Sequence, residues 1–256
     1  MPRTVITGIT RQGWLYLDEL FVAKGYRVYG LVRGQGNQRI ATAEEFIPSI
    51  ELLEGDLRGL PNLIGAPEIA HRDEIDNLGA IGFVGLSWKP AEPTGGGVLR
   101  ILEAIRIHTQ NGMGRVHSCQ ALGSQKFSKV HATPRRETTA FDGCSRCVVC
   151  RTFGHCSLVD YRELCGAFGL SAILFNHESP RRGHGFLNHK VTRAVARIPL
   201  GPRHIFAPGN FDTRRDRGFA DDFGVDDWVP LGVQDPRFSR FAEVGRHKGG
   251  ARLEAA

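Results

Sequence analysis

Two stretches of the chain combine residue types that suit the binding of phosphate groups. Directly after an apolar run, 176–183 places an Asn, a His and a Glu beside Arg181 and Arg182, and guanidinium groups bind phosphate oxygens through paired hydrogen bonds. Near the N-terminus, Thr7-Gly8-Ile9-Thr10 interrupts an apolar run, and a glycine there lets backbone N–H groups approach a pyrophosphate. A proline turn with two solvated arginines is the alternative for the first stretch. Together the two stretches predict a nucleotide site.

The elements around Gly8 have the pattern of a dinucleotide-binding fold. A short apolar run at 5–6 precedes the turn, apolar residues recur at roughly helical spacing over 15–22, and a second apolar run covers 28–32. This strand, helix and strand order predicts that the first turn faces a pyrophosphate and that Arg33, after the second strand, meets the ribose.

The glycine spacing in this turn departs from the dinucleotide fingerprint. Gly8 and Gly13 do not have the required separation, and Arg11 and Trp14 stand where the pattern carries its second and third glycines. A tryptophan in the first turn of the helix should push that helix away from the sheet, at the cost of about 1–3 kcal/mol that overpacking brings. We therefore expect weak binding of the dinucleotide.

Strands and helices alternate along the rest of the chain. Further strands are expected at 50–53, 73–78, 114–120 and 170–175, and further helices at 95–108, 150–168 and 190–198. This order predicts an α/β fold, a Rossmann-like doubly wound parallel sheet with helices on both faces.

Composition places the chain among soluble globular proteins. It has 256 residues, of which 23% are charged and 41% hydrophobic, and no apolar stretch reaches the length of a membrane span. We expect a cytoplasmic protein without a membrane partner. The formal charge of +6 occurs without a nucleic-acid-binding motif, so we assign it to a solvated surface and a nucleotide pocket rather than to nucleic acid.

A cysteine cluster offers a different function. Cys144, Cys147 and Cys150, followed by His155 and Cys156, have ligand types that could hold zinc or an iron–sulfur cluster. Residues three and six apart on a helix do not all share one face, however, so isolated reduced thiols are the preferred interpretation and no metal site is predicted.

Three runs of sequence resemble one known family. Residues 24–33 (Lys-Gly-Tyr-Arg-Val-Tyr-Gly-Leu-Val-Arg), 174–183 (Leu-Phe-Asn-His-Glu-Ser-Pro-Arg-Arg-Gly) and 209–216 (Gly-Asn-Phe-Asp-Thr-Arg-Arg-Asp) resemble GDP-mannose 4,6-dehydratase, an extended short-chain dehydrogenase/reductase, and the likeness covers about residues 2 to 228. The resemblance implies an NADP-dependent lyase that converts GDP-mannose to GDP-4-keto-6-deoxy-mannose on the way to GDP-fucose.

The resemblance also implies where ligands bind. The NADP contacts would be Gly8, Ile9, Thr10, Arg11, Gln12, Arg33, Asp56, Leu57, Leu78, Gly79, Ala80, His177 and Arg182. The nucleotide sugar would contact Asn176, Lys190 and Arg215.

The four catalytic positions of the family carry other residues here. Aligned through 138–141, the family's Tyr and Lys fall on Cys147 and Arg151, and aligned through 120–121 its Thr and Glu fall on Gly123 and Gln125. A glutamine cannot serve as a base, a glycine has no hydroxyl, and a cysteine sulfur does not reach as far as a phenol oxygen. We expect impaired catalysis, with an inactive pseudoenzyme that binds nucleotide or assembles with an active relative as the alternative.

The resemblance divides the chain into three parts. Residues 1–175 would form the NADP-binding domain and 176–229 an incomplete, smaller substrate-binding portion, while 230–256 would be a divergent, basic and disordered tail. The expected partners are a nucleotide sugar and either a second copy of the chain or an active relative.

Overall fold

The computed structural model describes most of the chain. The described residues are 1–9, 12–34, 40–41, 45, 47–65, 73–79, 92–112, 116–123, 139–143, 145–197, 217–222 and 241–242. Within these ranges, no helix is both long and apolar enough to cross a lipid bilayer.

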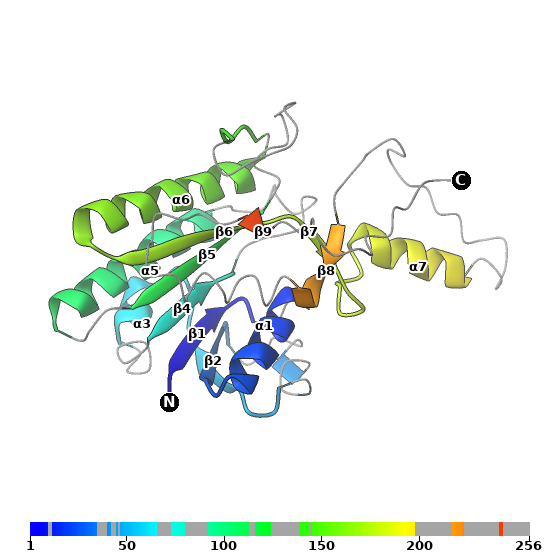
Figure 1. The fold of residues 1–256 in the computed structure, drawn as a ribbon, viewed down its shortest axis with the longest axis horizontal. Helices are drawn as coiled ribbons and strands as arrows, with labels where there is room; N and C mark the ends of the chain where they lie inside the picture. Colours follow the sequence, from blue (N-terminus) through cyan, green and yellow to red (C-terminus); the bar gives the residue numbers. More distant parts are fainter. Residues whose placement is uncertain are drawn as a thin grey trace.

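The main sheet has seven strands in the order β3-β2-β1-β4-β5-β6-β9, and every neighbouring pair is parallel (Figure 1). Its strands are β1 (Arg3–Thr7), β2 (Arg27–Val32), β3 (Glu51–Glu54), β4 (Glu74–Asn77), β5 (His117–Gly123), β6 (Phe168–Leu174) and β9 (Phe241–Ala242). Parallel neighbours need crossover connections, and helices provide them. The predicted Rossmann-like parallel sheet is confirmed.

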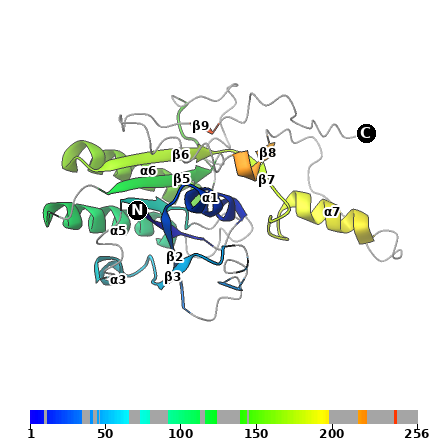
Figure 2. The same ribbon diagram turned by 60° about the horizontal axis from the view of Figure 1, so that its bottom comes forward.

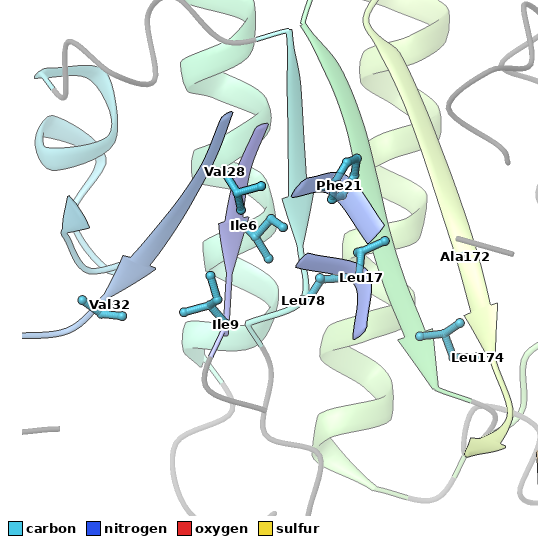
Figure 3. Close-up of a cluster of buried hydrophobic side chains, with 9 residues drawn as sticks. All are labelled: Ile6, Ile9, Leu17, Phe21, Val28, Val32, Leu78, Ala172 and Leu174. Atoms are coloured by element: carbon cyan, nitrogen blue, oxygen red, sulfur yellow. The ribbon is translucent and has the colours of Figure 1, made fainter. Parts of the chain in front are cut away.

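Helices cover both faces of this sheet. They are α1 (Gln12–Ala23), α3 (Leu60–Gly65), α5 (Glu92–Gln110) and α6 (Arg146–Cys165). Leu17 and Phe21 of α1 pack with Ile6 and Val28 on one face, as Figure 3 shows. On the other face, α3 and α5 pack against β1 and β4, and α6 packs beside α5. The alternation of side chains along β1 explains this, because Val5 and Ile6 point to opposite faces.

A smaller unit follows the sixth strand. Strands β7 (Asn176–Glu178) and β8 (Arg217–Phe219) form a two-stranded parallel sheet, and α7 (Leu187–Arg197) follows β7 in sequence. Figures 1 and 2 both show α7 beyond β7 and β8, away from the main sheet. No residue of α7 is buried.

The structure differs from the sequence expectations in the bounds of α6 and in two further strands, among other places. Helix α6 begins at Arg146 because Ser145 caps it, with the Val148 N–H donating to the Ser145 hydroxyl, and it ends before Gly166, whose φ is 64°. Residues 176–178, for which no strand was expected, form β7. Two residues of the tail that was expected to be disordered form β9, paired with Ile173 and Leu174.

Three carboxyl groups are buried on the α1 side of the sheet. Asp18 of α1 is fully buried, and neither of its side-chain oxygens has a hydrogen-bond partner. Asp76 accepts a 2.9 Å hydrogen bond from the Thr4 hydroxyl, and Glu74 accepts one of 3.2 Å from Tyr26. Burial raises the pKa of both Glu74 and Asp76 to about 7, and burial followed by the nearby Asp76 charge raises that of Asp18. Protonation of these carboxyls therefore favours the folded state.

This cluster predicts how stability depends on pH. A folded-state pKa above the unfolded value gives stability that is complete below about pH 4 and is lost as the pH rises toward 7. Asp18→Asn, which removes the charge, should raise the free energy of unfolding by about 1–3 kcal/mol at pH 8 and by much less at pH 4. Urea unfolding at both values measures this.

The matched control is Asp160→Asn, since Asp160 is an exposed aspartate of α6. It should leave stability unchanged at both pH values. An equal effect of Asp18→Asn at pH 4 and pH 8 would contradict the assignment of a buried, protonated carboxyl.

Candidate functional site

The sheet order puts a topological switch point, here called the crevice, at the carboxyl ends of β1 and β4. The chain runs from β1 outward to β2 and β3 and then crosses to β4 on the other side of β1. Connections leave the carboxyl ends of β1 and β4 in opposite directions, and such a switch point is where open α/β sheets bind ligands. The turns that follow the two strands contain Gly8 and Gly79, which the sequence assigned to the cofactor.

The backbones of these two turns are in close contact. Gly8 has a φ of 77°, and a Cβ on it would lie 2.9 Å from both the Cα and the N of Gly79. A Cβ on Gly79 would lie 2.9 Å from the Thr7 hydroxyl and from a methyl group of Leu57. Gly8 therefore requires glycine, while a side chain at Gly79 would force Leu57 or Thr7 to move.

The Thr7 side chain fastens the two turns together. Its hydroxyl donates to the Asn77 side-chain oxygen at 2.7 Å and accepts from the N–H groups of Leu78 and Gly79 at 3.1 and 2.9 Å. All of this side chain is buried. Thr7 was not among the predicted site residues. The signal that could have identified it is a small hydroxyl residue directly before the glycine at the end of β1.

The apolar residues that were predicted to contact the cofactor, Ile9, Leu57 and Leu78, differ in how far their side chains are buried. Ile9 and Leu78 are buried in the core cluster on the α1 face (Figure 3), so only their backbones can face a ligand. Ile9 fills the space above Gly30, where a Cβ would lie 2.6 Å from its Cδ1. Leu57 is partly exposed, and it lies against Gly79 and also Gly97 of α5.

Arg33 and Asp56 follow the neighbouring strands β2 and β3. Asp56 is held by Arg58, whose backbone N–H donates to one carboxylate oxygen at 2.9 Å and whose Nε donates to the other at 2.7 Å. These bonds lower the pKa of Asp56, and the charge of Arg33 lowers it further. Arg33 is exposed beyond β2, as expected of a residue that meets a ribose or its phosphate.

His177 of β7 is a neutral hydrogen-bond acceptor. Its Nδ1 lies 3.0 Å from the Phe175 carbonyl, which can only accept, so Nδ1 carries the proton and Nε2 has the lone pair. Burial lowers the pKa of His177 to about 4, and the nearby charge of Arg182 adds to this effect. Asn176, the other predicted contact on this strand, is partly buried.

The two predicted arginines have different surroundings. The Arg182 Nε lies 3.4 Å from a Glu178 carboxylate oxygen, and its guanidinium lies 3.7 Å above the Phe186 ring. Arg181 points instead to α1, where Glu19 binds it. Arg182 thus remains beside His177 in the site, and Arg181 does not.

Three of the four predicted catalytic positions fall on β5 and α6. Gly123 ends β5, and its register partner is Leu174, two residues before Asn176. This places Gly123 close to the start of β7. Cys147 and Arg151 are four residues apart on α6 and so share one face of that helix. Arg151 is partly buried.

For the other predicted site residues the structure gives less detail. Gln12 is the first residue of α1, and Lys190 is exposed on α7. The predicted residues outside the described ranges are Thr10, Arg11, Ala80, Gln125 and Arg215.

Part of the cysteine cluster also lies within the described ranges. Cys150 is partly buried and Cys156 is exposed, while the His155 Nδ1 lies 2.8 Å from the Ser171 hydroxyl. Cys144 lies outside the described residues. Among the side chains that are described, no group of three or more His, Cys, Asp or Glu residues could hold a metal ion.

Comparison with solved structures places the chain in a structural class. It is similar to a dTDP-glucose 4,6-dehydratase from Streptomyces venezuelae, solved with NAD and TYD bound, with a TM-score of 0.74 and 18% identity over 90% of this chain and 72% of that one. A UDP-galactose 4-epimerase gives a TM-score of 0.71 at 20% identity, over 93% of this chain and 76% of that one. With the glycine turn at the switch point, these matches define a Rossmann-like protein with the short-chain dehydrogenase/reductase fold.

Sequence comparison identifies the family. The model of the family described as GDP-mannose 4,6 dehydratase matches residues 5–239. GDP-mannose 4,6-dehydratases from Yersinia enterocolitica and Homo sapiens are 38% and 36% identical, each over 92% of this chain. This chain belongs to the GDP-mannose 4,6-dehydratase family. The match extends beyond residue 228, where we expected the likeness to end.

The chain does not span the full length of these relatives. Its alignment covers 66% of the Yersinia enterocolitica protein and 66% of the human one.

Because the turns that contain Gly8 and Gly79 are in contact, we predict that one methyl group added at Gly8 destabilises the fold. Gly8→Ala should lower the free energy of unfolding by about 2–4 kcal/mol, because it combines a positive φ with a clash against backbone. Urea unfolding measures the loss.

Gly112→Ala is the matched control. Gly112 has a φ of 74° but nothing within 4 Å of its Cβ position, so its substitution should cost only the backbone strain, about 1 kcal/mol. Equal losses for the two variants would show that Gly8 and Gly79 are not in contact.

Proposed function

We propose that this chain is a GDP-mannose 4,6-dehydratase-type protein that binds NADP and GDP-mannose and whose catalytic step is impaired. The observation that carries the proposal is the pairing of a preserved glycine crevice with replaced catalytic residues. Gly8 and Gly79 keep the backbone contact at the switch point. Gly123, Cys147 and Arg151 occupy the positions of the family's Thr, Tyr and Lys.

The crevice fits a dinucleotide. Gly8 puts a turn without a side chain at the end of β1, where backbone N–H groups can approach phosphate oxygens. Arg33 offers an exposed cation for a ribose phosphate, and the cofactor contacts of the smaller unit are His177 and Arg182. When bound, NADP would supply the hydride acceptor and donor of the reaction.

The proton transfers of the reaction depend on protein side chains. Because those side chains are replaced here, we expect catalysis to be impaired. The reaction needs one group that takes the O4 proton when C4 is oxidised, and another that takes the C5 proton and gives a proton to the C6 hydroxyl, which leaves as water. Gln125, at the position of the family's Glu, cannot act as that second base. Cys147 can ionise beside a cation, but its short side chain keeps it from the position of a phenol oxygen.

A binding or assembly role is the second candidate. The features that favour it are the same crevice and the neutral imidazole of His177, since both can bind a ligand without turnover. Such a chain would act alone, as a homo-oligomer, or with an active relative.

Activity should be very low in the natural chain and should return when the family residues are restored. We expect the purified protein with GDP-mannose and NADP⁺ to give little 4-keto-6-deoxy product by mass spectrometry. The fourfold variant Gly123→Thr, Gln125→Glu, Cys147→Tyr and Arg151→Lys should be at least ~10²-fold faster, the range that general acid–base groups contribute.

The control for this variant carries Cys147→Phe in place of Cys147→Tyr, which keeps the ring and omits the hydroxyl. It should stay inactive. Equal rates for the natural chain and the restored variant would refute impairment. A restored variant that binds both ligands but forms no product would favour the binding role.

The first turn of α1 should limit NADP affinity. Trp14 lies in this turn, where the family has glycine. Trp14→Gly should therefore strengthen NADP⁺ binding, measured by calorimetry, even though glycine weakens the helix by about 1 kcal/mol. Trp14→Leu, which keeps a large side chain, should not. A sub-micromolar dissociation constant for the natural chain would contradict this expectation.

A further inference from the structure

Arg181 makes a paired contact with α1 across a long stretch of sequence. Its Nη1 and Nη2 donate to the two carboxylate oxygens of Glu19 at 3.0 and 2.8 Å. Only 20% of the Arg181 side chain and 38% of the Glu19 side chain are exposed to solvent. A two-point contact of this kind fixes orientation as well as distance.

Aromatic rings complete this junction. The Arg181 guanidinium lies 4.3 Å from the centre of the Tyr16 ring, and Tyr16 in turn meets Phe219 edge to face at 5.7 Å. Tyr16 and Glu19 are three residues apart and share one face of α1. The junction therefore joins three elements, namely α1, the segment after β7 and the end of β8.

Arg181 lies in a tight turn that is held by hydrogen bonds, so a shift of Arg181 would also shift the residues beside it. The Arg181 N–H donates to the Ser179 hydroxyl at 3.1 Å, and the Arg182 N–H donates to the Ser179 carbonyl at 3.0 Å. This turn begins directly after β7, which carries His177.

The junction also has a consequence for phosphate binding. The hydrogen bonds that Arg181 donates to Glu19 raise the pKa of Arg181, with the charges of Glu19 and Asp221 adding to the effect. The Arg181 guanidinium is thus already bound to the Glu19 carboxylate. Of the two adjacent arginines, Arg182 is the one beside His177, and Arg181 is engaged by α1.

We propose that Arg181 is a positioning residue that holds β7 and its site residues in place relative to α1 by binding Glu19 and Tyr16. The inference rests on the proposed function, because it matters only if α1 and β7 contact the same bound ligands. Under it, the dinucleotide turn and the sugar-binding strand keep one relative orientation.

The test uses charge reversal and its rescue. GDP-mannose binding to the full chain, with saturating NADP⁺, is measured by calorimetry for Arg181→Glu, for Glu19→Arg and for the two combined. Each single change should weaken binding about tenfold, and the combined change should recover most of the loss because the ion pair is restored in reverse. Arg181→Lys should lose affinity partly, since it keeps the charge but not the paired contact.

The matched control is the ion pair of Arg27 and Glu51, which joins β2 and β3 at their amino ends, away from the crevice. Arg27→Glu should leave GDP-mannose affinity unchanged. A structural role alone would lower the melting temperature without the loss and rescue of affinity.

The outcomes separate the two proposals. Single variants that bind as well as the natural chain, or a combined variant that recovers nothing, would overturn the positioning role while the proposed function stands. A natural chain that is folded but binds neither NADP⁺ nor GDP-mannose would overturn the proposed function, and the positioning role with it.

Discussion

The close approach of the Gly8 and Gly79 backbones is the constraint on which the site depends. The two turns meet where Gly8 has no Cβ to strike the Gly79 backbone, and the Thr7 hydroxyl holds them with three hydrogen bonds. Strand pairing sets the spacing of β1 and β4 themselves, and this contact brings together the turns that follow their carboxyl ends.

The sequence predicted the architecture well because periodicity and element order carry that information. The alternation of apolar runs and helical spacing predicted the parallel sheet, and Gly8 lies after β1 as the predicted strand and turn required. Element ends were less accurate, since Ser145 and Gly166 decide them through capping, which periodicity does not reveal. Strand β7 was missed because Pro180 and the two arginines after it have the composition of a turn.

The site was harder to predict wherever a residue's partner is distant in sequence. Arg181 and Arg182 are adjacent and chemically identical, yet only the structure shows that Glu19, on α1, takes the first of them. Asp18 is a similar case. Its place in the helical pattern gives no hint that a carboxyl lies fully buried beside Asp76, contrary to the usual preference of aspartate for solvent.

The bonds made by Thr7 also govern when the site can exist during folding. They join residues that are 70 to 72 positions apart in sequence, so the crevice cannot form until β4 has been placed beside β1. Contacts of this range form slowly, because a long loop must close first. A nucleotide that binds the crevice would find no partial site in the unfolded chain. Its whole binding free energy would then favour the native state, and cellular nucleotide concentration would help to set how much of this protein is folded.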